Sequence, residues 1–238
     1  MIQSSISINS QYWEESEVFY MAVKSLKISN NVIRRMPRYL RKLDELSAAG
    51  VERISSNELG KLLGLTPSQI RQDFSCFGEF GQQGYGYNLV SLRQSIAKIL
   101  GMDRDYSAVV IGVGHLGHAL VDHFNFSAWG FSLKAAFDLK EDLSAKTPVY
   151  KFTDLGNYCK ETPIDVAVVC VPMDHAQEAT DAAIAAGVKA IWNFTNAVLE
   201  VPDHIIKEDI YFSDSLLALE YYLAEMLDEE AKRAAKGK

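Results

Sequence analysis

Three glycines with the spacing G-x-G-x-x-G, at positions 112, 114 and 117, are the residues whose types and spacing most clearly suggest chemistry. A short apolar run, residues 108–111, precedes them and a helix-compatible segment follows. The pattern therefore predicts a strand that enters a helix through a phosphate-binding turn. The first amides of such a helix lack partners within the helix and lie at its positive dipole end, which suits a diphosphate. We predict a dinucleotide-binding turn formed by Gly112, Val113, Gly114, His115, Leu116 and Gly117. The alternative is a glycine-rich turn in an α/β domain that binds no ligand.

A second apolar run ends in the carboxylate of Asp138, slightly further from Gly112 than the usual spacing of about 20 residues. A carboxylate at that strand end would accept hydrogen bonds from the ribose hydroxyls of an adenosine and would repel a 2′-phosphate. The predicted cofactors are therefore NADH and NAD⁺ rather than NADPH, although Lys140 lies nearby and argues weakly against this choice.

Histidines offer little evidence for catalysis or for a metal. His175 follows a predicted strand and is the best candidate for an acid or base beside a nicotinamide, but no convergent Asp or Arg partner is apparent. His115 and His118 lie three residues apart, and no thiol or carboxylate set completes a metal site. We favour surface histidines in each case, and expect neither a catalytic residue nor a metal ligand.

The charge distribution points to a nucleic acid despite a net charge of −7 over 238 residues. Residues 24–104 hold 13 Lys and Arg against 7 Asp and Glu, whereas residues 105–238 hold 11 against 21. A basic first half is the electrostatic signature of a DNA-binding region. No apolar run reaches the roughly 18 residues that a membrane helix needs, and the N-terminus lacks a signal-peptide pattern, so we expect a cytoplasmic protein with no membrane partner.

The basic half also carries a predicted helix-turn-helix. The first predicted helix has apolar residues at 39, 40, 43 and 46 and has Pro37 in its first turn. A capping box formed by Ser55 and Glu58 begins the second helix, and Thr66 caps the third helix. Residues 77–88 contain several glycines and predict a hairpin that would serve as a wing. The predicted DNA-binding residues are Arg38, Arg41, Ser56, Thr66, Ser68, Gln69, Arg71, Gln72, Gln83 and Tyr85. The alternative is a small helical packing or dimerisation module with a solvated basic face.

The second half predicts an alternation of strands and helices. Residues 148–150, 164–172, 190–194 and 210–212 read as strands, and 176–186 as a helix. Val171 and Pro172 end the central strand, and Asn193 lies near the end of the next, so all three are predicted to bind cofactor. The last segment, from residue 213, is a long helix with apolar residues on more than one face, and we expect it to dock on another subunit of a homodimer.

The domain boundaries follow from these patterns. We predict an N-terminal extension at 1–28 without an assigned role, a winged-helix domain at 29–104, a Rossmann-like domain at 105–212 and a C-terminal helix at 213–238. The predicted fold class is α/β.

Seven stretches, taken together and in order, resemble the Rex family of redox-sensing transcriptional repressors. They are residues 38–43, 65–81, 84–88, 111–117, 136–138, 193–195 and 219–223. The resemblance implies a winged helix joined to a Rossmann domain, and a homodimer whose C-terminal helices cross to the partner subunit. It also implies binding of operator DNA when NAD⁺ predominates and release when NADH binds, with Phe212 of one subunit beside the nicotinamide of the other.

The sequence departs from this family at several positions. Gln72 stands where the family usually has Lys, and His123 and Tyr211 stand where it often has a Tyr and an Asp. In the family those two exchange partners with an Arg that corresponds to Arg41, so we predict Arg41, His123 and Tyr211 as the switch residues. Two alternatives remain: an NAD-dependent dehydrogenase with an N-terminal docking module, and a structural Rossmann-like subunit.

Overall fold

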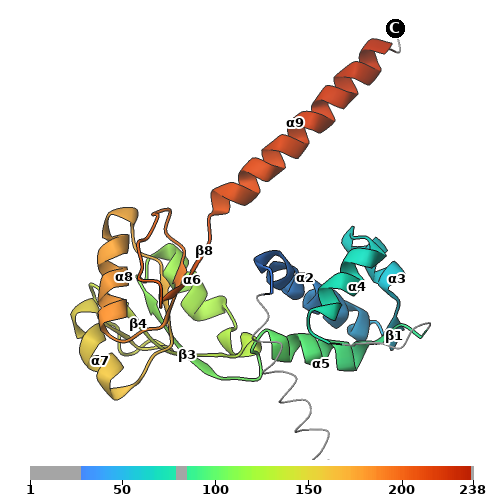
Figure 1. Cartoon of the computed structure of the whole chain (residues 1–238). Coiled ribbons are helices and arrows are strands. Elements are labelled where there is room, and N and C mark those ends of the chain that lie inside the picture. Colours follow the sequence, from blue (N-terminus) through green and yellow to red (C-terminus); the bar gives the residue numbers. More distant parts are fainter. Residues whose placement is uncertain (1–27, 79–84, 237–238) are drawn as a thin grey trace, which may run out of the picture. The chain divides into compact units, whose positions relative to one another are not determined.

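The computed structural model describes residues 28–78 and 85–236 and divides the chain into two compact units, one ending at Asp103 and the other beginning at Arg104 (Figure 1). All but the last residue of the predicted extension at 1–28 lie outside the described part, as does Gln83.

The first unit is a small helical domain with a two-stranded sheet. Its elements are α2 (Asn30–Ala48), β1 (Arg53–Ile54), α3 (Ser56–Leu63), α4 (Pro67–Ser75), β2 (Tyr87–Asn88) and α5 (Leu89–Ile99). The caps are those that the sequence predicts: Ser55 and Glu58 form a capping box on α3, and the Thr66 hydroxyl accepts the Gln69 amide on α4. Gly64 ends α3 in the left-handed conformation, φ 68°, which a glycine adopts at least cost.

The prediction for Pro37 is wrong, because this residue lies inside α2 rather than in its first turn. The helix begins seven residues earlier, and Val32, Met36, Leu40 and Leu43 follow one another at helical spacing in the core. A proline inside a helix removes one backbone hydrogen bond and costs about 3 kcal/mol. Burial of this continuous apolar face offsets that cost.

Residues 79–84 of the predicted hairpin at 77–88 lie outside the described residues, so the hairpin stays a prediction. In the described part of this segment, β2 pairs antiparallel with β1, with Ile54 opposite Tyr87. Gly86 precedes β2 with φ 69°, and a Cβ there would lie 2.8 Å from the Ile54 carbonyl oxygen. This position therefore requires a glycine for the two strands to meet.

The second unit is a six-stranded parallel sheet in the order β5-β4-β3-β6-β7-β8. Its strands are β3 (Tyr106–Ile111), β4 (Phe131–Asp138), β5 (Val149–Lys151), β6 (Val166–Val169), β7 (Ala190–Asn193) and β8 (Ile206–Asp209). Its helices are α6 (His115–His123), α7 (Leu155–Glu161), α8 (Ala176–Ala185) and α9 (Phe212–Lys236), with short 3₁₀ turns η1 (Phe126–Trp129), η2 (Phe152–Asp154) and η3 (Met173–His175).

The sheet has a separate core on each face, as a doubly wound α/β fold requires. Val109 and Ile111 pack with side chains of α7 and α8, whereas Val110 packs on the opposite face with residues of α6 and η1. The chain leaves β3 in one direction along the sheet, through β4 and β5, and returns to add β6, β7 and β8 on the other side. The strand order therefore reverses between β3 and β6, and ligands of such sheets bind at the carboxyl ends of the strands at this point.

The last strand is not where the sequence placed it. The structure has β8 at Ile206–Asp209 instead of residues 210–212, and Phe212 is the first residue of α9. The short apolar run at 210–212 resembled a strand, whereas β8 has only one apolar residue, Ile206, and its four residues alternate between exposed and half-buried, as expected at a sheet edge.

Candidate nucleotide cavity and DNA-facing helices

Each glycine of the turn between β3 and α6 has a different environment. Gly112 has φ 92°, and a Cβ there would lie 2.8 Å from the backbone of Cys170 and Val171. A Cβ at Gly117 would lie 1.9 Å from the Gly112 carbonyl oxygen, so this glycine lets α6 pack against the end of β3. A Cβ at Gly114 would meet nothing within 4 Å. The second glycine therefore faces open space, where a diphosphate could approach the backbone.

Asp138, at the end of β4, is tied to this turn. One carboxylate oxygen accepts the Val113 amide at 2.5 Å and the other accepts the Leu139 amide at 2.7 Å. Asp138 is predicted to bind a ribose, and its carboxylate also holds the glycine turn in place. One side chain thus has both roles.

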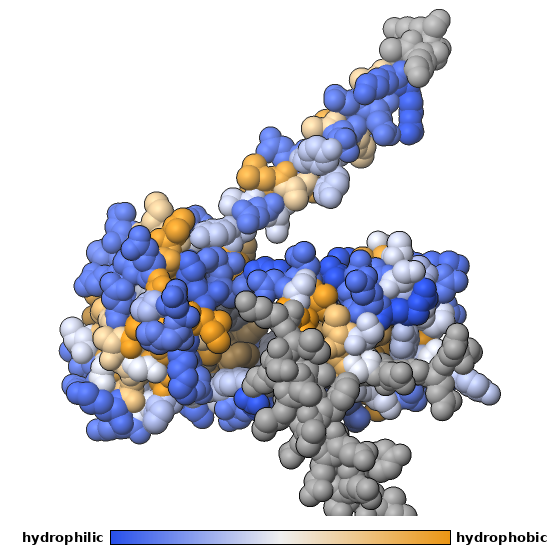
Figure 2. Space-filling model, viewed as in Figure 1, coloured by the Kyte–Doolittle hydropathy of each residue, from blue (hydrophilic) through white to orange (hydrophobic). Residues whose placement is uncertain are grey.

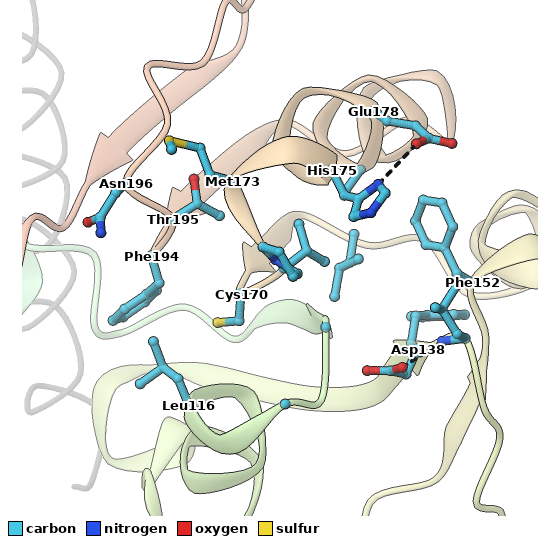
Figure 3. Close-up of a pocket in the computed structure, with 18 residues that line it drawn as sticks. Leu116, Asp138, Phe152, Cys170, Met173, His175, Glu178, Phe194, Thr195 and Asn196 are labelled. Atoms are coloured by element: carbon cyan, nitrogen blue, oxygen red, sulfur yellow. Dashed lines mark hydrogen bonds and ion pairs between the residues drawn. The ribbon is translucent and has the colours of Figure 1, made fainter.

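A cavity of about 880 Å³ opens at the carboxyl ends of β3, β4 and β6, a volume within the range of small-molecule sites. Its lining comes from the glycine turn, the strand ends and the loop after β7 (Figure 3). The lining residues are Ile111, Gly112, Gly114, Leu116, Phe137, Asp138, Leu139, Phe152, Cys170, Val171, Pro172, Met173, His175, Glu178, Ala179, Phe194, Thr195 and Asn196.

The cavity brings together six of the eleven predicted cofactor-binding residues, namely Gly112, Gly114, Leu116, Asp138, Val171 and Pro172. Val113, His115 and Gly117 belong to the same turn but do not line the described cavity. Sequence reasoning missed the remaining lining residues. The loop at Thr195 and Asn196 had a signal, because it directly follows a predicted strand end.

The two ends of the cavity differ in character. Figure 3 shows Asp138 and Phe152 at one end, and Phe194, Thr195 and Asn196 at the other. Burial raises the pKa of the nearby Cys170 thiol to about 12, so this side chain is uncharged at neutral pH. The far end is therefore walled largely by apolar and neutral groups.

His175 lies at the cavity rim, and its Nδ1 is 3.8 Å from a carboxylate oxygen of Glu178 (Figure 3). Both side chains are mostly exposed, at 68% and 75%. Within residues 28–78 and 85–236, no three His, Cys, Asp or Glu side chains are grouped so that they could hold a metal ion.

Asn193 has a different environment from the one predicted. Its side chain is fully buried beneath the cavity wall and forms hydrogen bonds with Thr195, Ala197 and Asp209. It is therefore placed to shape the wall rather than to contact a ligand directly.

The C-terminal helix α9 carries a long apolar surface. Phe212, Leu216, Leu219, Leu223 and Met226 recur at alternating spacings of four and three residues, and all five are exposed in the single chain. Figure 2 shows hydrophobic residues interleaved with hydrophilic ones along α9. The ring of Phe212 lies 6.4 Å, between centroids, from that of Phe194 in the cavity wall.

In the first unit, α4 presents the predicted DNA-binding side chains. The Arg71 guanidinium donates to the hydroxyls of Ser56 at 3.0 Å and Ser68 at 3.1 Å, so three predicted residues form one cluster. Gln72 is also exposed on this helix, and Tyr85, before β2, is 71% exposed. Arg38, on α2, donates to the Leu63 carbonyl at the end of α3.

A buried carboxylate holds α4 against α2. Asp73 is 0% exposed. Its two carboxylate oxygens accept hydrogen bonds from the Arg35 guanidinium, from the Tyr39 hydroxyl and from the side-chain amide of Gln69, at 2.6–2.8 Å. Burial alone would raise the pKa of Asp73, but the hydrogen bonds from Arg35, Tyr39 and Gln69 outweigh it and hold that pKa below the ordinary value. Asp73 thus fixes the helix that carries Arg71.

The predicted switch residues are distributed over both units. Arg41 is exposed on α2. His123 is the exposed last residue of α6, and Tyr211 is partly buried immediately before α9.

Two family models match the sequence. One, described as "Putative DNA-binding protein N-terminus", covers residues 27–75, and the other, described as "CoA binding domain", covers residues 103–197. The matches correspond to the helical unit and to the parallel-sheet unit.

Curated relatives match most of the chain. The redox-sensing transcriptional repressor Rex of Thermoanaerobacter pseudethanolicus is 44% identical over 218 residues, which is 90% of this chain and 96% of the relative. The Rex repressor of Clostridium beijerinckii is also 44% identical, over 85% of this chain and 98% of the relative.

Solved structures agree with this match. RSP in complex with β-NAD⁺ and operator DNA is 43% identical with a TM-score of 0.79, covering 89% of this chain and 98% of that one. RSP in complex with β-NADH is 40% identical with the same TM-score, covering 87% and 100%. Within the described residues, no helix is both long enough and apolar enough to cross a membrane.

Proposed function

This chain belongs to the Rex family of redox-sensing transcriptional repressors, and we propose that it binds operator DNA through its first unit and releases that DNA when NADH fills the cavity of its second unit. The observation that carries this proposal is the cavity itself, which joins an open glycine turn at one strand end to an apolar wall at the far end. The relatives are repressors, so a dehydrogenase is not favoured, and we propose no catalytic residue.

The residues suggest how the dinucleotide would lie. The amides of the first turn of α6, beside Gly114, would bind the diphosphate, and Asp138 would accept hydrogen bonds from the adenosine ribose. This orientation places the nicotinamide toward Phe194 and Leu116, at the other end of the cavity (Figure 3).

The redox preference follows from charge. NAD⁺ carries a positive charge on its nicotinamide ring, whereas NADH is neutral there. A wall of largely apolar and uncharged groups penalises a cation that has no partner and accepts a neutral ring. A 100-fold loss of DNA affinity on NADH binding requires a coupling free energy of about 2.7 kcal/mol, which desolvation of one charge is large enough to supply.

We further propose that the protein acts as a homodimer in which α9 packs on the partner subunit. A helix with five exposed apolar residues in one stripe needs a covering surface. A dimer would also present two copies of α4, whose spacing must match successive major grooves for both to bind. Closure of the dimer around NADH would then change this spacing.

The experiment that tests the function is selection of DNA from random duplexes by the purified protein, with and without NADH. We expect enrichment of a palindromic sequence without NADH and loss of that enrichment with it. Absence of enrichment in both conditions, together with dinucleotide oxidation or reduction on a panel of small alcohols, would support the dehydrogenase alternative.

A further inference from the structure

The buried amide of Asn193 makes every hydrogen bond that it can make. Its Nδ2 donates to Asp209 Oδ1 at 2.8 Å and to the Ala197 carbonyl at 3.1 Å. Its Oδ1 accepts from the Thr195 amide at 2.9 Å and the Thr195 hydroxyl at 2.7 Å. A primary amide has two donor hydrogens and one oxygen with two lone pairs, so these four contacts fix both its position and its orientation.

On one side, Asn193 holds the wall of the cavity. Thr195, Phe194 and Asn196 all line the cavity and follow β7 directly (Figure 3). The Thr195 hydroxyl in turn accepts the Ala197 amide at 3.2 Å, so the wall is built as one short hydrogen-bonded loop. If a bound ligand displaced Thr195, the hydrogen bonds between Thr195 and Asn193 would have to shift or break.

On the other side, Asn193 holds the segment that leads into α9. Asp209 is the last residue of β8 and pairs in register with Asn193, and the next amide, of Ile210, donates to the Asn193 carbonyl at 2.8 Å. Phe212 starts α9 three residues after Asp209. The Lys207 ammonium forms an ion pair with the other carboxylate oxygen of Asp209, at 3.3 Å. The same ammonium donates a hydrogen bond to the Leu199 carbonyl.

We propose that Asp209 is a positioning residue for the NADH response, which it serves through Asn193 by tying the cavity wall to the first turn of α9. This inference rests on the proposed function. The link consists of short, directional hydrogen bonds around an amide that is 0% exposed, so any ligand-driven shift of the wall must either move Asp209 or leave a buried polar group without a partner. Chains of hydrogen-bonded side chains of this kind are one physical means by which two sites of a protein are coupled.

The test is the ratio of the operator Kd with saturating NADH to the operator Kd without NADH, measured by fluorescence anisotropy on full-length protein and a duplex that this protein has selected. For wild type we take a ratio of about 100. We expect Asp209→Ala to lower the ratio below about 10 while changing the Kd without NADH by less than about 3-fold. NADH affinity, read from its own fluorescence, reports whether the cavity remains intact.

The matched control is Asp165→Asn. Asp165 is also a carboxylate beside a strand of this sheet and also holds a lysine, Lys189 at 2.7 Å, and the hydroxyl of Ser107, but at the amino ends of the strands. We expect Asp165→Asn to lower the stability of the protein and to leave the ratio of the two operator Kd values unchanged. If Asp209→Ala does not fold, Asp209→Glu decides the question in the same way, because it keeps the charge and moves the carboxylate away from Asn193.

A ratio like that of wild type in the Asp209 variant would overturn the inference, as would equal losses in the Asp209 and Asp165 variants. A wild-type protein that binds the duplex equally well with and without NADH would refute the proposed function, and the inference with it. The two failures are therefore distinguishable.

Discussion

At the scale of single residues, the carboxylate of Asp73 is held by three other side chains of the first unit. It connects α4 to α2 through Arg35 and Tyr39, and it orients Gln69. Because a carboxylate only accepts hydrogen bonds, the Gln69 side-chain amide turns its nitrogen toward Asp73.

We predict that Asp73→Asn lowers the free energy of unfolding of the first unit by about 3 kcal/mol, since it leaves the Arg35 guanidinium without its charged partner. The pH dependence has a definite sign. The pKa of Asp73 is lower in the folded protein than its ordinary value of 3.8, so its contribution is complete above that value and is lost as the pH falls below it. Urea unfolding followed by circular dichroism at several pH values should show a shallower acid loss in the variant. An identical acid profile in both proteins would contradict this role.

Arg71 is the residue on which we expect DNA binding to depend most. Arg71→Ala should abolish specific binding, because it removes the cation that Ser56 and Ser68 hold at the exposed face of α4, and it should leave NADH affinity unchanged. Anisotropy titration of the selected duplex measures the first effect and NADH fluorescence the second. Lys160→Ala, which removes one exposed cation from α7 in the other unit, is the control and should bind DNA normally. Loss of both activities in Arg71→Ala would indicate misfolding instead.

At the scale of elements, the glycine turn separates a packing role from a binding role. Gly117→Ala should lower stability and NADH affinity together, because its Cβ would lie 1.9 Å from a backbone oxygen that cannot move away without displacing α6. Gly114→Ala should leave the melting temperature nearly unchanged and weaken NADH binding by at least about 10-fold, since its Cβ meets only open space where we place the diphosphate.

Gly156→Ala, within α7, is the control for both glycine variants, because a Cβ there also meets nothing within 4 Å and no ligand is proposed beside it. Thermal melts and NADH titrations of the three variants give the comparison. Normal NADH affinity in Gly114→Ala would remove the diphosphate from that position.

The sequence predicted the elements that local chemistry determines. The caps at Ser55 and Thr66 and the strand–turn–helix at Gly112 depend on residues within a few positions of one another, and the structure confirms them as secondary structure. The elements that depend on distant partners could not be read in this way. Pro37 lies inside a helix because of core packing, and β2 pairs with β1 from across the unit.

The same distinction between local and distant determinants applies to the residues of the site. The carboxylate of Asp138 at a strand end was predictable, because it ends the apolar run that follows the glycine turn, although it lies slightly further from Gly112 than the usual spacing. Asn193 was predicted to contact the ligand, but it is buried under the loop at Thr195 and hydrogen-bonded to Asp209 in β8. The sequence did not predict this environment, because the apolar run at 210–212 indicates a last strand there instead of at β8.

At the scale of the whole molecule, α9 should decide the oligomeric state. We expect the double variant Leu219→Lys/Leu223→Lys to sediment as a monomer where wild type sediments as a dimer, because two charges in the apolar stripe would be desolvated at the interface. Analytical ultracentrifugation measures this directly. Asp228→Ala lies on the opposite face of the helix from Leu219 and should remain dimeric. A monomeric wild type, or a dimeric double variant, would exclude the stripe as the dimer contact.

The two units together make a redox sensor only if the charge of the nicotinamide ring controls DNA affinity. The most direct measurement is a titration of the selected duplex with full-length protein at equal, saturating concentrations of NAD⁺ and of NADH. We expect NADH to raise the Kd for DNA by about 100-fold and NAD⁺ to leave it nearly unchanged. Equal effects of the two dinucleotides would contradict this expectation.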